Sequence, residues 1–265
     1  MDVIGNNISN VNTTGFKAGR TDFADSFSQT LRASSPGTGG NSGTASMQVG
    51  SGVTTSAIRN LYTQGAIART GLQTDLAVAG EGYFLVRDTI SNQQFVTRAG
   101  DFRVDESGYL ITNNGHRVQG YNDSTLTNLG DIRIDTAGMP ATSDPAATLL
   151  SFAIDGEGKV NVTLSDNSQF VRGQVLLQQF RDPQGLVKEG NNLYSGLASA
   201  GPLTAPGAPG IAGLGKIEVG ALELSNVDLA GEFSSLITAQ RAFQANARIV
   251  TTSDEMLQEL VNLKR

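Results

Sequence analysis

The sequence predicts an α+β fold in which helices at the two ends of the chain form a coiled-coil layer and an antiparallel, β-rich domain lies between them. The C-terminal stretch repeats apolar residues at coiled-coil spacing and contains no proline after Val227. The middle of the chain alternates short apolar runs with turns rich in Gly and Asn. A shorter apolar face at the N-terminus offers the last helix a partner within the same chain.

The N-terminal region begins with a short predicted helix over residues 1–12, whose apolar face contains Val3, Ile4, Ile8 and Val11. Gly15 follows an Asn-Thr-Thr run and can adopt a positive φ, which favours a helix stop there. Phe23, Phe27 and Leu31 recur every four residues, so the sequence also allows a second short helix within residues 16–31.

Residues 33–52 are rich in Ser, Thr and Gly, which is typical of a flexible surface segment. A catalytic lid is the functional alternative, but the segment contains no catalytic group. We therefore divide the chain into a terminal helical region (1–32 plus 225–265), this flexible segment, and a β-rich outer domain (53–224).

The β-rich region is predicted from short runs bounded by Gly, Asp and Asn turns. The expected strands are 76–79, 83–86, 95–97, 102–104, 109–112, 117–121, 159–164, 169–180, 192–194 and 216–224.

Two hairpins share one pattern, FRVDESGYL from Phe102 and FAIDGEGKV from Phe152. In each, the Asp is expected to start the turn and the last Gly to supply an unusual backbone angle. Calcium binding at Asp155 is the alternative, but the acidic ladder and final Glu of an EF-hand loop are missing. We expect no metal there.

The C-terminal helix is predicted from Asp228 onward, with Ser225 or Asn226 as its N-cap. Nine charges between Asp228 and Arg265 exclude a membrane span. Polar Gln240 within the seam could fix helix register. Alternating steps of four and three residues define the seam as Leu229, Phe233, Leu236, Gln240, Phe243, Ala247, Val250, Asp254, Leu257 and Val261.

Composition excludes several classes of protein. A formal charge of −6 and a pI near 4.8 argue against nucleic acid as a partner. No apolar run is long enough to insert in a membrane, and the N-terminus lacks the pattern of a cleaved signal peptide. The absence of Cys fits the cytoplasm or an exported protein without disulfides.

The sequence also lacks a recognisable set of catalytic residues. His116 is the only histidine, it follows a turn, and no orienting carboxylate or nucleophile accompanies it, so a surface histidine is expected. The pair Asp254 and Glu255 falls on the predicted helix, where solvated charge is the expected role. We expect no enzyme activity and no cofactor.

Three motifs occur in order along nearly the whole chain. The first is GNNISNVNTTGFK at residues 5–17. The second comprises DLAVAGEGYF at residues 75–84 and TRAGDF at residues 97–102. The third comprises SNVDL at residues 225–229 and AQRAFQANA at residues 239–247. Together, these motifs resemble those of the bacterial flagellar hook and basal-body rod protein family.

The resemblance implies a structural subunit of the bacterial flagellum, exported by the type III apparatus without a cleaved signal. Such subunits polymerise into a hollow helical tube, with paired terminal helices inside and the β domain outside. Implied partners are further copies of the chain, adjacent axial proteins, the hook cap and the export apparatus.

Within the family, the ending at residues 251–265 looks most like compact hook proteins, and the distal rod protein is the second candidate. Only a short stretch separates Tyr121 from Phe152, so the extra domain of larger hook proteins does not fit. Family members begin some fifteen to twenty residues earlier, so this chain resembles one that lacks that start. Residues 33–52 could lie at a sliding contact between subunits. A secreted β-rich adhesin with a coiled-coil stalk is the more distant alternative.

The assembly interface is expected to combine the apolar seam, without Asp254, with residues of the terminal motifs. Paired hydrogen bonding suits the Asn residues, although simple turn and cap roles fit them equally. The residues added from the motifs are Asn6, Asn7, Asn10, Gly15, Phe16, Asn226 and Val227.

Overall fold

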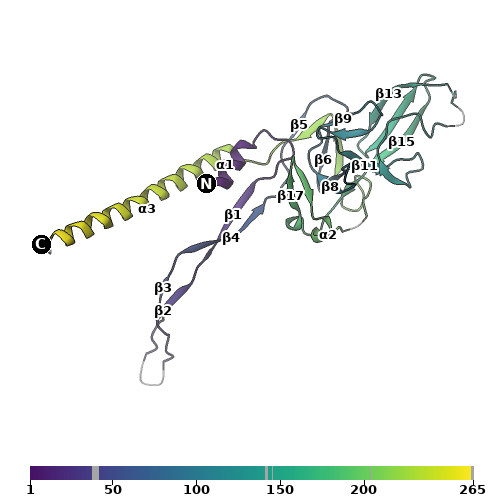
Figure 1. The fold of residues 1–265 in the computed structure, drawn as a ribbon. Helices are drawn as coiled ribbons and strands as arrows, with labels where there is room; N and C mark the ends of the chain where they lie inside the picture. The colour runs from purple at the N-terminus through teal and green to yellow at the C-terminus, as the bar shows by residue number, and fades with distance from the viewer. Residues whose placement is uncertain (38–41, 141–142, 145, 204, 264–265) are drawn as a thin grey trace.

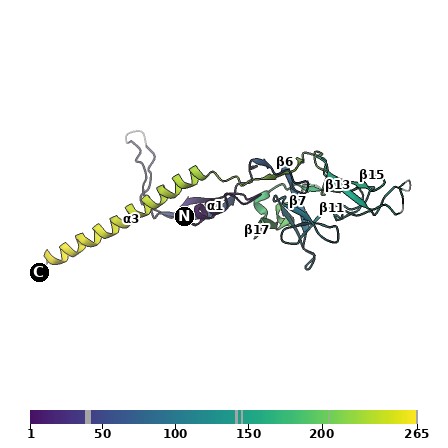
Figure 2. The ribbon, with the colours of Figure 1, turned by 90° about the horizontal axis from the view of Figure 1, so that it is seen from above.

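The computed structural model describes residues 1–37, 42–140, 143–144, 146–203 and 205–263. It has the predicted α+β fold, with a β domain at one end and a long C-terminal helix pointing away from it (Figure 1). The N-terminal helix lies beside the start of that long helix in both views (Figures 1 and 2). A two-stranded arm leaves the same region in a third direction.

The β domain is organised around one antiparallel sheet. Its main path runs through β13 (Leu149–Ile154), β14 (Lys159–Leu164), β15 (Gln169–Val175), β11 (Arg117–Tyr121), β7 (Tyr83–Arg87), β8 (Gln94–Thr97), β18 (Leu193–Ser195) and β17 (Val187–Gly190). Attached to this path are β9 (Phe102–Val104), β10 (Leu110–Thr112), β12 (Leu129–Asp131) and β16 (Leu177–Gln178).

Two further strand pairs connect this domain to the chain ends. They are β6 (Leu76–Ala79) with β19 (Lys216–Val219), and β5 (Ile67–Arg69) with β20 (Ala221–Glu223). A short 3-10 helix η1 (Pro183–Gly185) and helix α2 (Leu197–Ala200) lie near β17 and β18 along the chain. The pairs bring the segment before the last helix back to the start of the domain.

The hydrophobic core lies inside this domain. Phe84, Leu110, Val118 and Val160 are among its fully or almost fully buried members. Alternate residues of β14 point inward, as expected of a strand with one face on a core. The core therefore stabilises the outer domain and includes no residue of the last helix.

Both predicted hairpin turns are confirmed. The carboxylate oxygen of Asp105 accepts from the backbone N–H of Tyr109, and Asp155 accepts likewise from Lys159. The closing glycines, Gly108 and Gly158, have φ values of 83° and 77°. The aspartates therefore satisfy turn amides, which accounts for their place in the repeated pattern.

The predicted helix within residues 16–31 is wrong. This stretch forms strands β1 (Gly19–Asp25) and β2 (Ser28–Arg32), which pair with β4 (Val53–Asn60) and β3 (Met47–Gly50) to build the arm. A four-residue spacing also places side chains on one face of a strand, because strand side chains alternate with a period of two. The apolar spacing therefore did not discriminate between the two structures.

The segment predicted to be flexible is only partly irregular. Strand β3 lies within residues 33–52, where cross-strand hydrogen bonds position it, and all its residues are exposed. Residues 38–41 of the segment, like 264–265 of the C-terminal region, lie outside the described residues. The flexibility of the segment and the boundaries of the three regions stay predictions.

The terminal helices are α1 (Asp2–Ser9) and α3 (Leu229–Leu263). Helix α3 has 35 residues, which corresponds to a length of about 52 Å. Its N-cap is Asp228, whose carboxylate accepts from the N–H of Ala230 at 3.1 Å. The predicted caps, Ser225 and Asn226, are wrong, and Asn226 is used elsewhere. Within the described residues, no helix is both long and apolar enough to cross a membrane.

Candidate functional site

The sequence motifs meet at one buried junction between the β domain and the terminal helices. Nζ of Lys17, from the N-terminal motif, lies 2.7 Å from Oε1 of Glu223 on β20. Nη1 of Arg98, from the central motif, lies 3.2 Å from Oε2 of the same carboxylate. All three residues are at most 3% exposed. The junction therefore joins residues separated by up to 206 positions through one carboxylate.

Backbone groups complete this ion network. Lys17 Nζ also donates to the carbonyl oxygen of Thr63 at 2.7 Å, and Arg98 Nη2 donates to that of Gly80 at 2.8 Å. The N–H of Gly65 donates to Glu223 Oε1. Burial lowers the pKa of Lys17, and the neighbouring Glu223 carboxylate opposes that shift. Two cations share one anion, so removal of Glu223 would leave both buried without a counter-ion.

Gly15 allows the N-terminal motif to lie against the central motif. Its φ is 67°, and a Cβ atom built on it would lie only 2.6 Å from the backbone nitrogen of Ala99. Its N–H donates to the carbonyl of Glu223 at 2.8 Å. Only glycine fits at this position, because the backbone of Ala99 comes too close for a side chain. The neighbouring Phe16 is buried as well. Both residues thus have a role inside the chain.

Asn226 joins the two chain ends with its side-chain amide. Its Oδ1 accepts from the N–H of Ala18 at 2.8 Å, while its Nδ2 donates to the carbonyls of Leu61 and Thr63. A helix N-cap accepts from the first turn of its own helix, and the Asn226 side chain instead contacts two other segments, at Ala18 and at residues 61–63. Val227, the next residue, is half-buried beside it.

The three asparagines of the first helix have different environments. Asn7 is 2% exposed; it bonds both the N–H and the carbonyl of Gly19 and donates to Glu232 on α3. Asn10 donates to the carbonyl of Asn6 at 2.9 Å and ends the helix. Asn6 is exposed and its side chain makes no hydrogen bond within the described part of the chain. Of the three, Asn6 is exposed, Asn10 is half-buried and Asn7 is buried.

The apolar seam of α3 is not buried in the single chain. Helix α1 contacts one flank of it, so that Glu232, Leu236 and Ala239 are half-buried. Among the described residues, α3 has no buried member, and from Gln240 onward every one is exposed. Of the predicted seam only Leu236 is partly covered; the exposed members are Leu229, Phe233, Gln240, Phe243, Ala247, Val250, Asp254, Leu257 and Val261.

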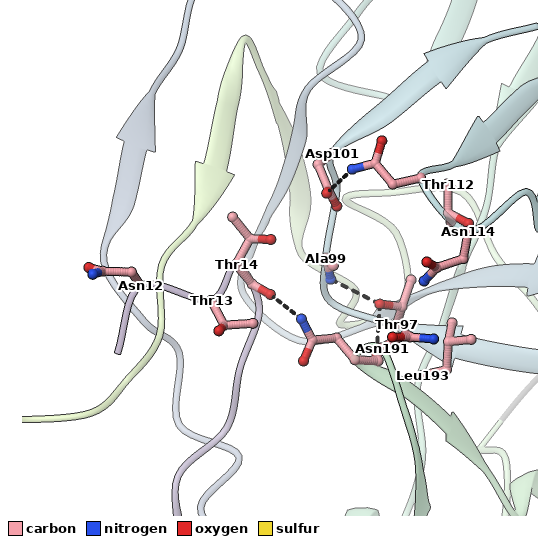
Figure 3. A pocket seen from close by; sticks show the side chains of 12 residues that line it. Asn12, Thr13, Thr14, Thr97, Ala99, Asp101, Thr112, Asn114, Asn191 and Leu193 are labelled. Carbon is pink, nitrogen blue, oxygen red and sulfur yellow. Dashed lines mark hydrogen bonds between the residues drawn. The ribbon is translucent and has the colours of Figure 1, made fainter. Parts of the chain in front are cut away.

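A polar groove of about 360 Å³ opens beside the junction (Figure 3). The side chain of Asn192 donates to the carbonyl of Thr14 at 2.8 Å, and its own carbonyl accepts from Thr97 Oγ1. Two other lining residues are also paired, since the Asn113 side chain donates to Asp101. Burial raises the pKa of Asp101, and Asn113 partly opposes the shift. The groove contains amides and hydroxyls suited to hydrogen bonding and shows no nucleophile paired with a base.

His116 is less exposed than predicted. Its side chain is 18% exposed, its Nδ1 lies 3.8 Å from Asp88 Oδ1, and its ring packs near that of Phe95. No nucleophile contacts it among the residues described, so the structure provides no catalytic arrangement around it.

The sequence did not predict that Lys17, Arg98 and Glu223 form one buried ion network. Lys17 lies in the N-terminal motif and Arg98 in the central motif. A charged residue without an assigned role in each motif could therefore have indicated the ion pairs. Glu223 lies in a strand with ordinary alternation, and nothing local distinguishes it from exposed Glu218. Pairing across more than two hundred residues has no periodic signature in the sequence.

Comparisons with known proteins agree with this architecture. Family models match at residues 1–17 (Flagella basal body rod protein), 77–162 (Flagellar hook protein FlgE/F/G D1 domain) and 218–263 (Flagellar basal body rod FlgEFG protein C-terminal). The matches at the two ends include both terminal helices. The chain belongs to the flagellar rod and hook protein family.

Individual relatives extend the match to the whole chain. Flagellar basal-body rod protein FlgG of Bacillus subtilis is 42% identical over 265 residues, covering 100% of this chain and 93% of that protein. FlgG of Borreliella burgdorferi is 35% identical, with 100% and 93% covered. Flagellar hook protein FlgE of the same organism is 26% identical, with 100% and 96% covered. The chain is thus a structural, axial protein of the bacterial flagellum.

A solved structure, the Helicobacter pylori flagellar hook protein FlgE2, matches at 13% identity, with 66% of this chain and 46% of that chain covered. Its TM-score is 0.22, which supports no argument about the arrangement of the domains.

Proposed function

We propose that this chain is a subunit of the flagellar rod, polymerised into a hollow helical tube with its terminal helices on the inside. The observation that carries the proposal is the exposed part of α3 beyond its contact with α1, in which large apolar side chains such as Phe243, 69% exposed, face solvent. Apolar surface of this extent is characteristic of interaction sites. Coiled-coil contacts with α3 of neighbouring copies would remove it from water.

The arm supports the same proposal. A two-stranded ribbon is only marginally stable alone, and this one exposes Phe23, Phe27 and Val53. Packing against a neighbouring subunit would stabilise it. In that arrangement the outer domain, the arm and the inner helices each contact other copies, and the buried junction fixes their relative directions.

The rod is favoured over the hook, our first sequence prediction, by the pattern of relatives. The FlgG relatives align over 265 and 268 positions, close to the length of this chain. The alignment to hook protein FlgE spans 426 positions, so that protein has a large insertion without counterpart here. Among the residues that the structure describes between Tyr121 and Phe152, the strands are β12 and the start of β13. This supports the second sequence prediction, the distal rod.

The remaining partners follow as part of the proposal. The subunit is exported by the type III apparatus without a cleaved signal and then contacts the adjacent axial proteins. Deletion of the gene, followed by electron microscopy of purified basal bodies, tests the assignment. Rods that stop before their distal section are expected. Complete rods without hooks would assign the chain to the hook, and intact flagella would contradict an axial role.

A further inference from the structure

An arginine-rich pocket lies on the outer domain, among residues of β7, β12 and β15 and the loops beside them. It has a volume of about 350 Å³ and is lined by Arg87, Tyr109, Asn122, Gly130, Asp131, Arg133 and Arg172. Arg117 does not line the pocket, but it adds a fourth guanidinium to the cluster through its ion pair with Asp131. Such a concentration of cations is unexpected on a chain whose net charge is −6.

Two aspartates hold the four arginines in pairs. Asp131 lies 2.5 Å from Nη2 of Arg87 and 3.2 Å from Nη1 of Arg117. Asp135 lies 2.5 Å from Nε of Arg172 and 3.2 Å from Nε of Arg133. Each carboxylate therefore serves two guanidinium groups, and the cluster retains a surplus of two positive charges.

The guanidinium of Arg133 is partly exposed to solvent and is held in a fixed orientation. Its Nε donates to the carbonyl of Ser107 at 3.0 Å, and its guanidinium lies 5.3 Å from the centre of the Tyr109 ring. The side chain is 44% exposed. Among the described residues no acceptor is bonded to its two terminal nitrogens. A guanidinium held by Nε and presenting both terminal nitrogens is arranged to bind a carboxylate through two parallel hydrogen bonds.

We propose that this pocket binds a carboxylate side chain presented by a second copy of the chain, with Arg133 as its bidentate donor. The proposal rests on the proposed polymerisation. The net charge of −6 means that carboxylates outnumber cations over the remainder of the same chain, so a second copy is a partner of complementary charge. A contact between a pocket on one copy and a different surface of the next is heterologous, the type that builds helical polymers.

Charge reversal of Arg133 tests the proposal in the full chain. We expect Arg133→Glu to raise the critical concentration for polymerisation at least tenfold, and Arg133→Lys, which keeps charge but loses the planar fork, to have a smaller effect. Arg103→Glu is the matched control, because Arg103 is an exposed arginine of β9 outside the pocket. It should stay within twofold of the wild-type chain. Equal behaviour of Arg133→Glu and Arg103→Glu would overturn the proposal.

A second measurement separates the pocket from polymerisation itself. The monomer is titrated with a tetraglutamate peptide while the backbone amide resonances of Tyr109 and Arg133 are followed by NMR. Binding is expected in the wild-type chain and in Arg103→Glu, and its loss in Arg133→Glu. Absence of binding to the wild-type chain would overturn the anion site. A wild-type chain that binds the peptide but never polymerises would instead overturn the proposed function and the second-copy partner.

Discussion

Nδ2 of Asn7 donates to Oε1 of Glu232 at 2.9 Å, which joins the first helix of the chain to the last across 225 residues. The same amide side chain bonds both backbone groups of Gly19, at the start of the arm. One buried side chain thus positions α1, α3 and β1 relative to one another. This side chain therefore helps to hold the start of α3 beside α1 and β1.

Replacement of Asn7 by Ala should loosen this connection. The change leaves the N–H and carbonyl of Gly19 without partners, which costs about 1–3 kcal/mol for a buried group. We expect a loss of that size in the free energy of unfolding and faster amide exchange in α1. Asn6→Ala is the control, because Asn6 is exposed and should change the free energy by less than about 0.5 kcal/mol. Equal losses in the two variants would contradict this role.

Glu223→Gln should be the more damaging change at the junction. It leaves Lys17 and Arg98 buried without their shared anion, and breaking a buried ion pair in this way costs about 3–5 kcal/mol. Chemical denaturation measures the loss. Glu218→Gln, on the exposed side of β19, removes the same charge without touching the network and should be nearly neutral. A nearly neutral Glu223→Gln would show that the network contributes little.

Acid should weaken the outer domain through Asp131 and Asp135. Burial would raise the pKa of Asp131, but hydrogen bonds from Arg87, Gln119 and Arg117 outweigh it, so the net shift is downward. The pKa of Asp135 is lowered in the same way, chiefly by Arg172. These depressed values add stability above the unfolded pKa of about 3.9, and that stability is lost as pH falls through the folded values.

Denaturation midpoints at pH 7, 4 and 3 measure this acid dependence. The wild-type chain should lose stability between pH 4 and 3, and Asp131→Asn should show a smaller loss over the same interval. A wild-type profile that stays flat down to pH 3 would contradict the assignment.

The sequence predicted the fold class, most strands of the β domain and the long last helix. Strands 76–79, 102–104 and 117–121 were located because apolar runs between Gly and Asp turns have few alternative structures. The four-residue spacing of Phe23 and Phe27 did not predict the strands of the arm. Such a spacing places side chains on one face of a helix and also on one face of a strand. Interactions between distant segments, such as Lys17 with Glu223, depend on tertiary packing and leave no local pattern.

The predicted assembly interface stays a prediction, because the single chain shows only which of its residues are buried and which are exposed. Periodicity identified the seam of α3, but the single chain covers only its Glu232 side with α1 and leaves Phe233 and Phe243 exposed. The family motifs contained Asn7, Gly15 and Phe16, which the structure uses inside the chain. A motif marks residues that are needed, and burial decides whether they act within a subunit or between subunits.

Phe243→Asp should block assembly without harming the monomer. The side chain is 69% exposed, so its replacement should change the free energy of unfolding by no more than about 0.5 kcal/mol. A charge within the seam would face apolar side chains of a neighbouring helix, and we expect no tubes by electron microscopy. Ala245→Asp lies roughly 200° away around the helix and should assemble better. Normal tubes from Phe243→Asp would exclude the seam as an interface.

Hydrogen exchange of α3, measured in the monomer and in the assembled tube, tests the central claim most directly. In the monomer the amides from Gln240 onward have no tertiary cover among the described residues, so they should exchange quickly. On assembly the same amides should become protected, because neighbouring helices cover the seam. Full protection of α3 in a demonstrated monomer, or no gain in protection in the tube, would contradict the account.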